Sequence, residues 1–198
     1  MLERNECSCN KCKLFCKVMP SFLLPEDLIP YMEATGFVPV EDAMEGEDDS
    51  VSITLDQIFP WAVDNLLASD GAIVRIPDTN GMVRVPTLVP NNRKNGSCVH
   101  YNQKSGLCAV HKSAPFGCRF FSCSMKERDA IELSTSSCKR LGHMWFKLED
   151  DPDELSMIEG MYAAIWLELS EKGHKRSRTT MALRKRFERR LKEIERNE

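Results

Sequence analysis

Nine cysteines in a chain of 198 residues constrain this sequence more than any other feature. They form two groups, one near the N-terminus and one in the middle of the chain: Cys7, Cys9, Cys12 and Cys16, then Cys98, Cys108, Cys118, Cys123 and Cys138. No apolar signal-peptide core opens the sequence, and no run approaches the ~18–20 apolar residues that span a bilayer, so we expect a cytoplasmic protein without a membrane partner. A reducing compartment and an odd number of cysteines argue against a disulfide framework.

Three other roles remain open for the thiols. Free cysteines are common in cores as small hydrophobic side chains, but the first group stands among lysines and asparagines, which is a poor setting for a core. Thiolates also bind zinc and iron–sulfur clusters, and cysteine groups in intracellular proteins favour this role. The Cys9–Cys12 pair also matches the C-x-x-C of thioredoxin-like redox sites, although no strand pattern precedes it. We therefore expect a metal centre.

The spacing of the cysteines indicates that two segments share this centre. Cys9-Asn-Lys-Cys12 is a C-x2-C turn that brings two thiolates to one metal, and Cys16 follows four residues later. This triplet closes a tetrahedral site only if Cys7 or a cysteine of the second group joins it. From Cys98 to Cys123 no C-x2-C pair occurs, and the glycines and prolines there predict a loop-rich segment that donates ligands from several turns.

These residues resemble the YkgJ-type cysteine-cluster family, described as a zinc- or iron-chelating domain with a CxxCxxCC signature. Cys9, Cys12 and Cys16 fall on its first, second and fourth cysteines, and Phe15 occupies the third. The downstream family motif runs approximately C-x-I-Y-x-x-R-P-x-x-C-R-x-F. Its matches here are Cys108, Pro115, Cys118 and Arg119, while Val110, His111 and Ala114 replace Ile, Tyr and Arg. The resemblance covers roughly residues 7–123 and implies metal or iron–sulfur binding.

We expect an iron–sulfur cluster, most simply [4Fe–4S]. Its expected role is redox chemistry, electron transfer or a cluster-dependent modification reaction, with an unidentified protein or redox partner. The alternative is a structural zinc-binding interaction module. The predicted metal ligands are Cys9, Cys12, Cys16, Cys98, Cys108, Cys118 and Cys123. Arg119 is predicted to stabilise the charge of the bound cofactor by hydrogen bonding. Further candidate ligands are Cys7, Cys138, His100 and His111, and a histidine ligand would favour zinc or a mixed-ligand cluster. No glycine-rich nucleotide motif or phosphate loop accompanies them.

The pattern along the chain predicts an α+β fold in two parts, a metal-organised cysteine-rich domain over residues 1–148 and a C-terminal helical extension over 149–198. Residues 20–70 predict short helices. Pro25 begins one helix, which Pro30 ends or restarts. Thr54–Gln57 forms a capping box, and a helix runs from about residue 60 to Gly71. Residues 72–76 and 82–89 predict a hairpin with a loop at 77–81.

The C-terminal part predicts two helices, one that Asp151 caps and Gly173 ends, and one over residues 177–195. Residues 173–198 carry 10 Lys/Arg and 4 Asp/Glu, within a chain of net charge −3. We expect this basic face to be solvated or to lie against the acidic body of the chain. A nucleic-acid partner is not favoured, because no aromatic stacking platform accompanies the arginines.

Overall fold

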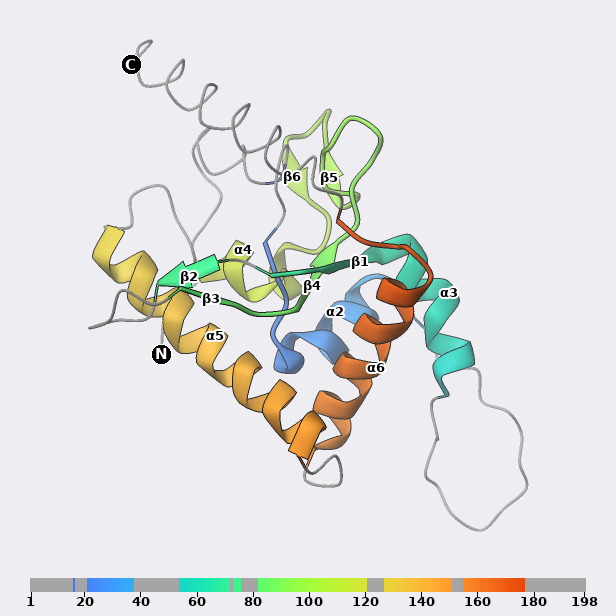
Figure 1. Ribbon diagram of the computed structural model, residues 1–198. Helices are drawn as coiled ribbons and strands as arrows, with labels where there is room; N and C mark the ends of the chain where they lie inside the picture. The colour runs from blue at the N-terminus through green and yellow to red at the C-terminus, as the bar shows by residue number, and fades with distance from the viewer. Residues whose placement is uncertain are drawn as a thin grey trace.

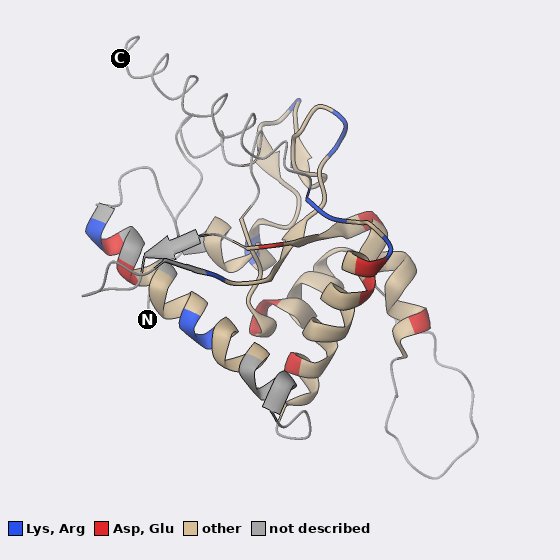
Figure 2. Ribbon diagram, viewed as in Figure 1, with Lys and Arg blue, Asp and Glu red and all other residues tan. Residues whose placement is uncertain are grey.

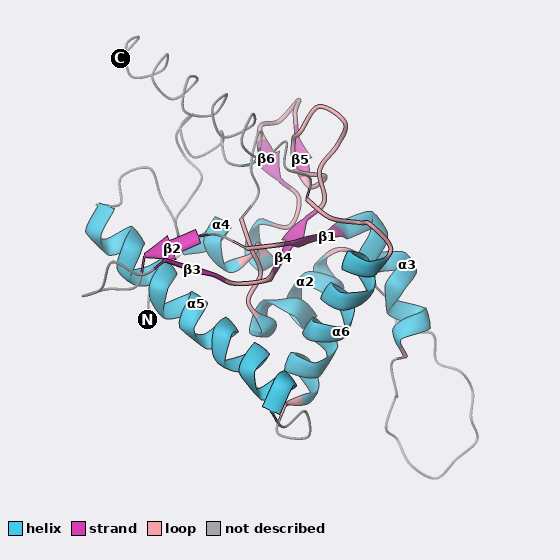
Figure 3. Ribbon diagram, in the orientation of Figure 1, coloured by secondary structure: helices cyan, strands magenta, loops and turns pink. Residues whose placement is uncertain are grey.

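The computed structural model describes residue 16 and residues 21–37, 54–71, 73–75, 82–120, 127–150 and 155–176. In this part of the chain, helices are combined with short antiparallel strand pairs (Figure 1 and Figure 3). The predicted α+β class is therefore confirmed. The two longest helices, α5 (Glu127–Asp150) and α6 (Met157–Glu171), meet in a V below the strands, and the hairpin of β5 (Tyr101–Asn102) and β6 (Leu107–Cys108) stands on the other side.

The first helical segment begins at a proline and contains a second one. η1 (Pro25–Asp27) is a single 3-10 turn, and it continues into α2 (Leu28–Ala34). Of the two outcomes predicted for Pro30, that it ends or restarts the helix, the second is confirmed, because α2 begins after the 3-10 turn and Pro30 lies within its first turn. Proline is tolerated there since the N–H groups of a first turn have no acceptor within the helix.

Helix α3 (Leu55–Asn65) begins at the predicted capping box. The Thr54 N–H donates to Oε1 of Gln57 at 3.1 Å. The helix ends at Asn65, so the prediction of helix as far as Gly71 is wrong, and residues 66–69 form strand β1 (Leu66–Ser69) instead. Leu66 and Ala68 are buried, and β1 pairs with β4 (Thr87–Pro90) from Leu66↔Pro90 to Ser69↔Thr87. This pairing with a segment distant in the sequence outweighs the helical pattern.

The predicted hairpin is present as β2 (Ile73–Arg75) and β3 (Met82–Arg84), which pair in antiparallel register. The single strand predicted over residues 82–89 is divided, because Val85 and Pro86 separate β3 from β4. Gly71 follows β1 with φ 85°, and a Cβ on it would lie 1.3 Å from the Val85 carbonyl oxygen. Glycine therefore allows the two backbones to approach at the point where the chain passes from one strand pair to the other.

Helix α5 was not predicted from the sequence, and it follows η2 (His111–Ser113) and α4 (Phe116–Phe120). Its buried apolar side chains include Cys138, Leu141 and Met144 at intervals of three residues, and Thr135 and Ser137 are buried beside them. Helix α6 begins at Met157, with Ser156 as its N-cap, and not after Asp151 as predicted. Residues 151–154 and the helix predicted over residues 177–195 lie outside the described residues.

The core joins the N-terminal segment, the strands and α6 around one tyrosine. The Tyr162 hydroxyl accepts the Leu88 N–H at 2.7 Å and donates to the Leu23 carbonyl at 2.9 Å, while the Leu23 N–H donates to the Leu88 carbonyl at 2.9 Å. Ile165 and Leu169 of α6 are also buried in this core. Within the described part of the chain, no helix has the length and apolar character needed to cross a bilayer.

Candidate metal centre

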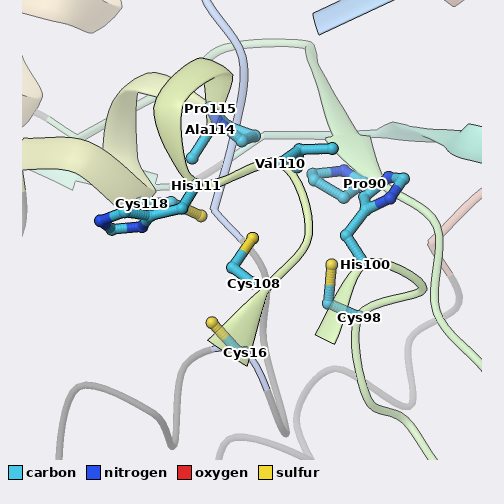
Figure 4. A pocket seen from close by; sticks show the side chains of 10 residues that line it. All are labelled: Cys16, Pro90, Cys98, His100, Cys108, Val110, His111, Ala114, Pro115 and Cys118. Atoms are coloured by element: carbon cyan, nitrogen blue, oxygen red, sulfur yellow. The ribbon is translucent and has the colours of Figure 1, made fainter. Parts of the chain in front are cut away.

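A small cavity near the β5–β6 hairpin is lined by four cysteines: Cys16, Cys98, Cys108 and Cys118 (Figure 4). They come from four separate segments, namely the N-terminal group, the loop before β5, the end of β6, and α4. The rest of the lining is mainly apolar: Pro90, Val110, Ala114 and Pro115, together with His100 and His111. The donor atoms that these side chains offer are sulfur and imidazole nitrogen, which are ligands of zinc and of iron–sulfur clusters.

A backbone hydrogen bond joins Cys16, the described member of the N-terminal cysteine group, to the second group. The Cys98 N–H donates to the Cys16 carbonyl at 2.8 Å, and Cys98 also forms an isolated bridge with Asn92. The Asn91 N–H, directly after β4, donates to the Asn65 carbonyl at the end of α3 at 2.8 Å. The β1–β4 pair thus fixes the start of the loop that carries Cys98. Cys16 therefore lies beside Cys98, and the convergence of the other N-terminal cysteines stays a prediction.

The β5–β6 hairpin places Cys108. This residue lies opposite Tyr101 in the strand pair, and Gly106 adopts a φ of 68° in the turn between the strands. The Ala109 N–H donates to the His100 carbonyl at 2.9 Å, which extends the pairing by one position. Cys98 and Cys108 therefore lie on the two arms of one hairpin. Cys98 precedes β5, and Cys108 is the last residue of β6.

A buried carboxylate positions the helix that carries Cys118. Oδ2 of Asp27, a residue only 3% exposed, accepts the Leu24 N–H at 3.0 Å and the Phe116 N–H at 2.7 Å. Phe116 is the first residue of α4, so this carboxylate joins η1 to the start of that helix. The Cys118 N–H donates to the Pro115 carbonyl at 2.8 Å.

Backbone N–H groups are directed at three of the four thiols. They belong to His100 at Cys98, to Val110 at Cys108, and to Ser21 at Cys118. In the first two cases the donor includes the residue two positions after the cysteine. Such hydrogen bonds favour the thiolate and lower the pKa of the cysteine. They are also the contacts by which proteins tune thiolate-bound metal centres.

Burial acts in the opposite direction on the same groups. It raises the pKa of Cys98 to about 11, raises that of Cys108, and raises that of Cys118 well above its ordinary value. The charge of a neighbouring thiolate raises the pKa further, most strongly between Cys118 and Cys16. These three thiols therefore hold their protons at neutral pH, and a bound cation would favour the loss of those protons.

His100 is held by a tyrosine from the core. The Tyr31 hydroxyl lies 2.6 Å from Nε2 of His100, and it also donates to the Asn65 carbonyl at 3.2 Å. The two rings meet edge to face, with centroids 5.3 Å apart. Burial, aided by the charge of Arg93, lowers the pKa of His100 to about 4, so the imidazole is neutral at neutral pH. His111, the other histidine of the lining, belongs to η2.

The remaining residues predicted for the site fall into two sets. Cys7, Cys9, Cys12 and Cys123 lie outside the described residues. Arg119 belongs to α4, and its contact with a cofactor stays a prediction. Cys138 is 3% exposed and lies in the hydrophobic core on α5 instead of lining the cavity. Of the described cysteines, four line the cavity, whereas Cys138 is buried in the hydrophobic core.

Two residues of the site were not found from the sequence, Tyr31 and Arg93. The Arg93 guanidinium donates from Nη2 to the Val99 carbonyl at 2.6 Å and from Nη1 to the Tyr101 carbonyl at 2.7 Å. These carbonyls flank His100, so one side chain holds the turn that follows Cys98. The asparagine- and glycine-rich turn at residues 91–96 was the sequence signal available for Arg93, whereas no local pattern marks Tyr31.

Comparisons with protein-family models, with curated proteins and with solved structures find no match to this chain. Within the described residues, no three histidine, cysteine or carboxylate side chains form a group that could hold one metal ion as they stand. The site is thus defined by its lining: four thiols, N–H groups directed at sulfur, and apolar walls.

Proposed function

We propose that this protein is a metal-binding protein whose centre is held by the thiolates of Cys16, Cys98, Cys108 and Cys118, and that the centre is an iron–sulfur cluster. One observation carries the proposal: four cysteines from four separate segments line a single small cavity. Free cysteines that serve only as small hydrophobic residues need no such convergence, as Cys138 in the core illustrates. Cys9, Cys12 and Cys123 are further candidate ligands from the sequence.

The donor set supports an iron–sulfur cluster over zinc. Structural zinc sites commonly take their ligands in C-x2–4-C pairs, whereas the four cysteines of the cavity each come from a separate segment. The N–H groups directed at three of the sulfurs are contacts that adjust the reduction potential of a cluster. A bound cluster would supply one-electron chemistry, which suits a role in electron transfer, redox sensing or a cluster-dependent modification reaction. The alternative is a structural zinc module that presents the helices to a partner protein.

The protein's own residues would exclude water from the centre and hold its ligands. Apolar side chains from β4 and from the segment before α4 wall the cavity. Tyr31 holds His100 by its Nε2, which leaves only Nδ1 of that imidazole for another partner. Arg93 and Asp27 fix the backbone at Cys98 and before Cys118. The chain thus has the means to hold thiolates rigidly, which a redox centre requires.

The test is metal and sulfide analysis of the full chain prepared anaerobically with iron and sulfide, together with visible and paramagnetic-resonance spectra. Stoichiometric iron and acid-labile sulfide with thiolate-to-iron absorption are expected. Stoichiometric zinc without iron uptake selects the structural zinc module. A protein that takes up neither metal refutes the proposal.

A pair of cysteine variants tests the assignment of the ligands. Cys118→Ser is expected to reduce the bound metal more than about tenfold and to lower the thermal midpoint of unfolding, because metal binding contributes folding free energy. Cys138→Ala is the control, since this buried cysteine lies in the core away from the cavity lining. It is expected to keep its metal while losing about 1–2 kcal/mol of stability from the small cavity left behind. Equal metal contents in both variants would contradict the assignment.

A further inference from the structure

The segment from residue 79 to residue 126 contains no aspartate or glutamate. It holds seven lysines and arginines, so it carries +7 in a chain of net charge −3, and the remainder of the chain carries −10. The same segment provides three of the four cysteines of the cavity. Basic side chains are commonly just solvated, but solvated surfaces usually mix charges of both signs. A segment without any acidic residue therefore needs a further reason, and the positions of its basic side chains supply one.

The loop before β5 and the β5–β6 hairpin form one projection. The Arg93 guanidinium donates to the Val99 carbonyl at 2.6 Å and to the Tyr101 carbonyl at 2.7 Å. The Gln103 amide donates to the Ser97 hydroxyl at 3.5 Å. These contacts hold the loop against the hairpin, and Figure 2 shows basic positions but no acidic ones along both.

Three lysines of this region have charges that the protein itself does not neutralise. Lys94 lies in the loop, Lys104 in the turn between β5 and β6, and Lys112 in η2, and all three are exposed. No carboxylate in the described part of the chain forms an ion pair with any of them. Their charges therefore add to one positive field beside the cysteine cavity, which attracts an anionic partner.

The projection also exposes one large apolar side chain. Leu107 of β6 is 62% exposed and directly precedes Cys108. A single exposed leucine is ordinary on a protein surface, but apolar contact within a polar rim is the composition of protein–protein interfaces. Tyr101, the one aromatic residue between residues 91 and 113, is buried, so this part of the surface offers no exposed ring on which bases could stack. The composition thus favours a protein over a nucleic acid.

We propose that the loop before β5, the β5–β6 hairpin and η2 form the docking face for an acidic partner protein, with Lys94, Lys104, Lys112 and Leu107 as its contact residues. This inference rests on the proposed function and deepens it by naming the chemistry of the partner. Cys98 and Cys108 lie on the two arms of the same hairpin, so a docked protein contacts the element that holds the centre. Complementary charge raises the rate at which such a partner associates and orients it on this face.

The test measures binding of a short fluorescent polyglutamate peptide to the metal-loaded full chain, by fluorescence anisotropy at low ionic strength. The double variant Lys94→Glu/Lys104→Glu reverses two charges of the docking face. The control is Arg128→Glu/Lys139→Glu, which makes the same change in net charge at two exposed residues of α5. The docking-face variant is expected to weaken binding more than about tenfold and the control to stay within about threefold, because charges act over about one Debye length.

Equal affinities of the two double variants overturn the inference, and this result is also expected if the basic residues 173–198 hold the peptide instead. If the docking-face variant does not fold, Lys94→Gln/Lys104→Gln decides, with an expected loss of about threefold or more. Metal content is measured on the same samples. A parent protein that takes up neither zinc nor iron refutes the proposed function, whereas a metal-loaded parent that does not bind the peptide refutes the docking face alone.

A second probe separates a protein partner from a nucleic acid. A glutamate peptide with one central phenylalanine is expected to bind the parent protein more tightly than polyglutamate does. Leu107→Ser is expected to remove this gain, while Leu55→Ser, at a leucine that is 44% exposed on α3, keeps it. A single-stranded oligonucleotide of equal charge is expected to bind more weakly than the phenylalanine peptide. Tighter binding of the oligonucleotide, or an unchanged gain in Leu107→Ser, overturns the assignment to a protein partner.

Discussion

Tyr31 and His100 show how single residues of the core set the properties of the cavity. Tyr31 is fully buried, and its hydroxyl lies between Nε2 of His100 and the Asn65 carbonyl. His100 was a candidate ligand because it follows Cys98 by two residues, but spacing alone did not show that one ring nitrogen is engaged by a tyrosine from α2. The histidine is therefore part of the wall that joins the cavity to the core.

The lowered pKa of His100 predicts a specific pH dependence of stability. The imidazole has a pKa of about 4 in the folded protein against an ordinary value of 6.5, so the unfolded chain binds more protons between these pH values. His100 therefore contributes stability above pH ~6.5 that is lost as the pH falls towards ~4. Because the side chain is partly exposed, we expect a loss of about 1–2 kcal/mol.

The measurement is the free energy of unfolding by denaturant at several pH values for the parent protein and for His100→Gln. The difference between the two proteins is expected to shrink as the pH is lowered from 7 to 4.5, because glutamine does not titrate. A difference that stays constant over this range would show that His100 is not held neutral in the folded state.

At the scale of elements, two adjacent carboxylates on η1 have different tasks. Asp27 is buried and bonds the N–H groups of Leu24 and Phe116, which joins η1 to α4. Glu26 is exposed and pairs with Arg140 of α5 at 3.1 Å, with the two side chains 56% and 59% exposed. A buried carboxylate bonded to backbone N–H groups contributes far more to stability than an exposed ion pair. The position of Cys118 thus depends on Asp27.

We predict that Asp27→Ala costs about 2–4 kcal/mol, because two buried N–H groups lose their acceptor. Glu26→Ala is the matched control, with an expected cost below about 1 kcal/mol. Chemical denaturation measures both. Metal content, measured on the same samples, is expected to fall in Asp27→Ala at temperatures where the variant remains folded, since α4 carries Cys118. Equal stabilities of the two variants would show that the joint between η1 and α4 is not needed.

At the scale of the whole molecule, the apolar core and the cysteine cavity are neighbouring but differently stabilised regions. The core contains buried side chains from the segment before η1 and from α2, α3, β1, β4, α5 and α6. The cavity instead collects short strands, turns and a five-residue helix, which bury less apolar surface of their own. In the proposed function a metal supplies the missing free energy there. Local stability should therefore depend on metal in one region more than in the other.

Hydrogen exchange before and after metal removal by a chelator tests this division. Amides between residues 98 and 118 are expected to exchange more than about tenfold faster without metal, whereas the Leu23 and Leu88 amides in the core should change much less. In Cys118→Ser, the chelator is expected to have little further effect. A uniform acceleration across both regions would mean that the centre stabilises the fold as a whole and not the cavity alone.

Local sequence rules accounted for the features that depend on neighbouring residues. The capping box at Thr54, the β2–β3 hairpin and the end of α6 at Gly173 each follow from side chains or backbone conformations within a few positions. The same rules failed at residues 66–69 and in α5. There, pairing with β4 and burial of Cys138, Leu141 and Met144 decided the structure.

The sequence by itself determined the α+β class and the two groups of cysteines from which a metal centre is inferred. Only the tertiary structure decided that Cys16 joins Cys98, Cys108 and Cys118 around one cavity while Cys138 enters the core. It also brought Tyr31 and Arg93 to the site. Cysteine spacing constrains only ligands that lie within one turn of the chain. The contacts of the site join segments far apart in the sequence, so they depend on how the strands and α6 pack.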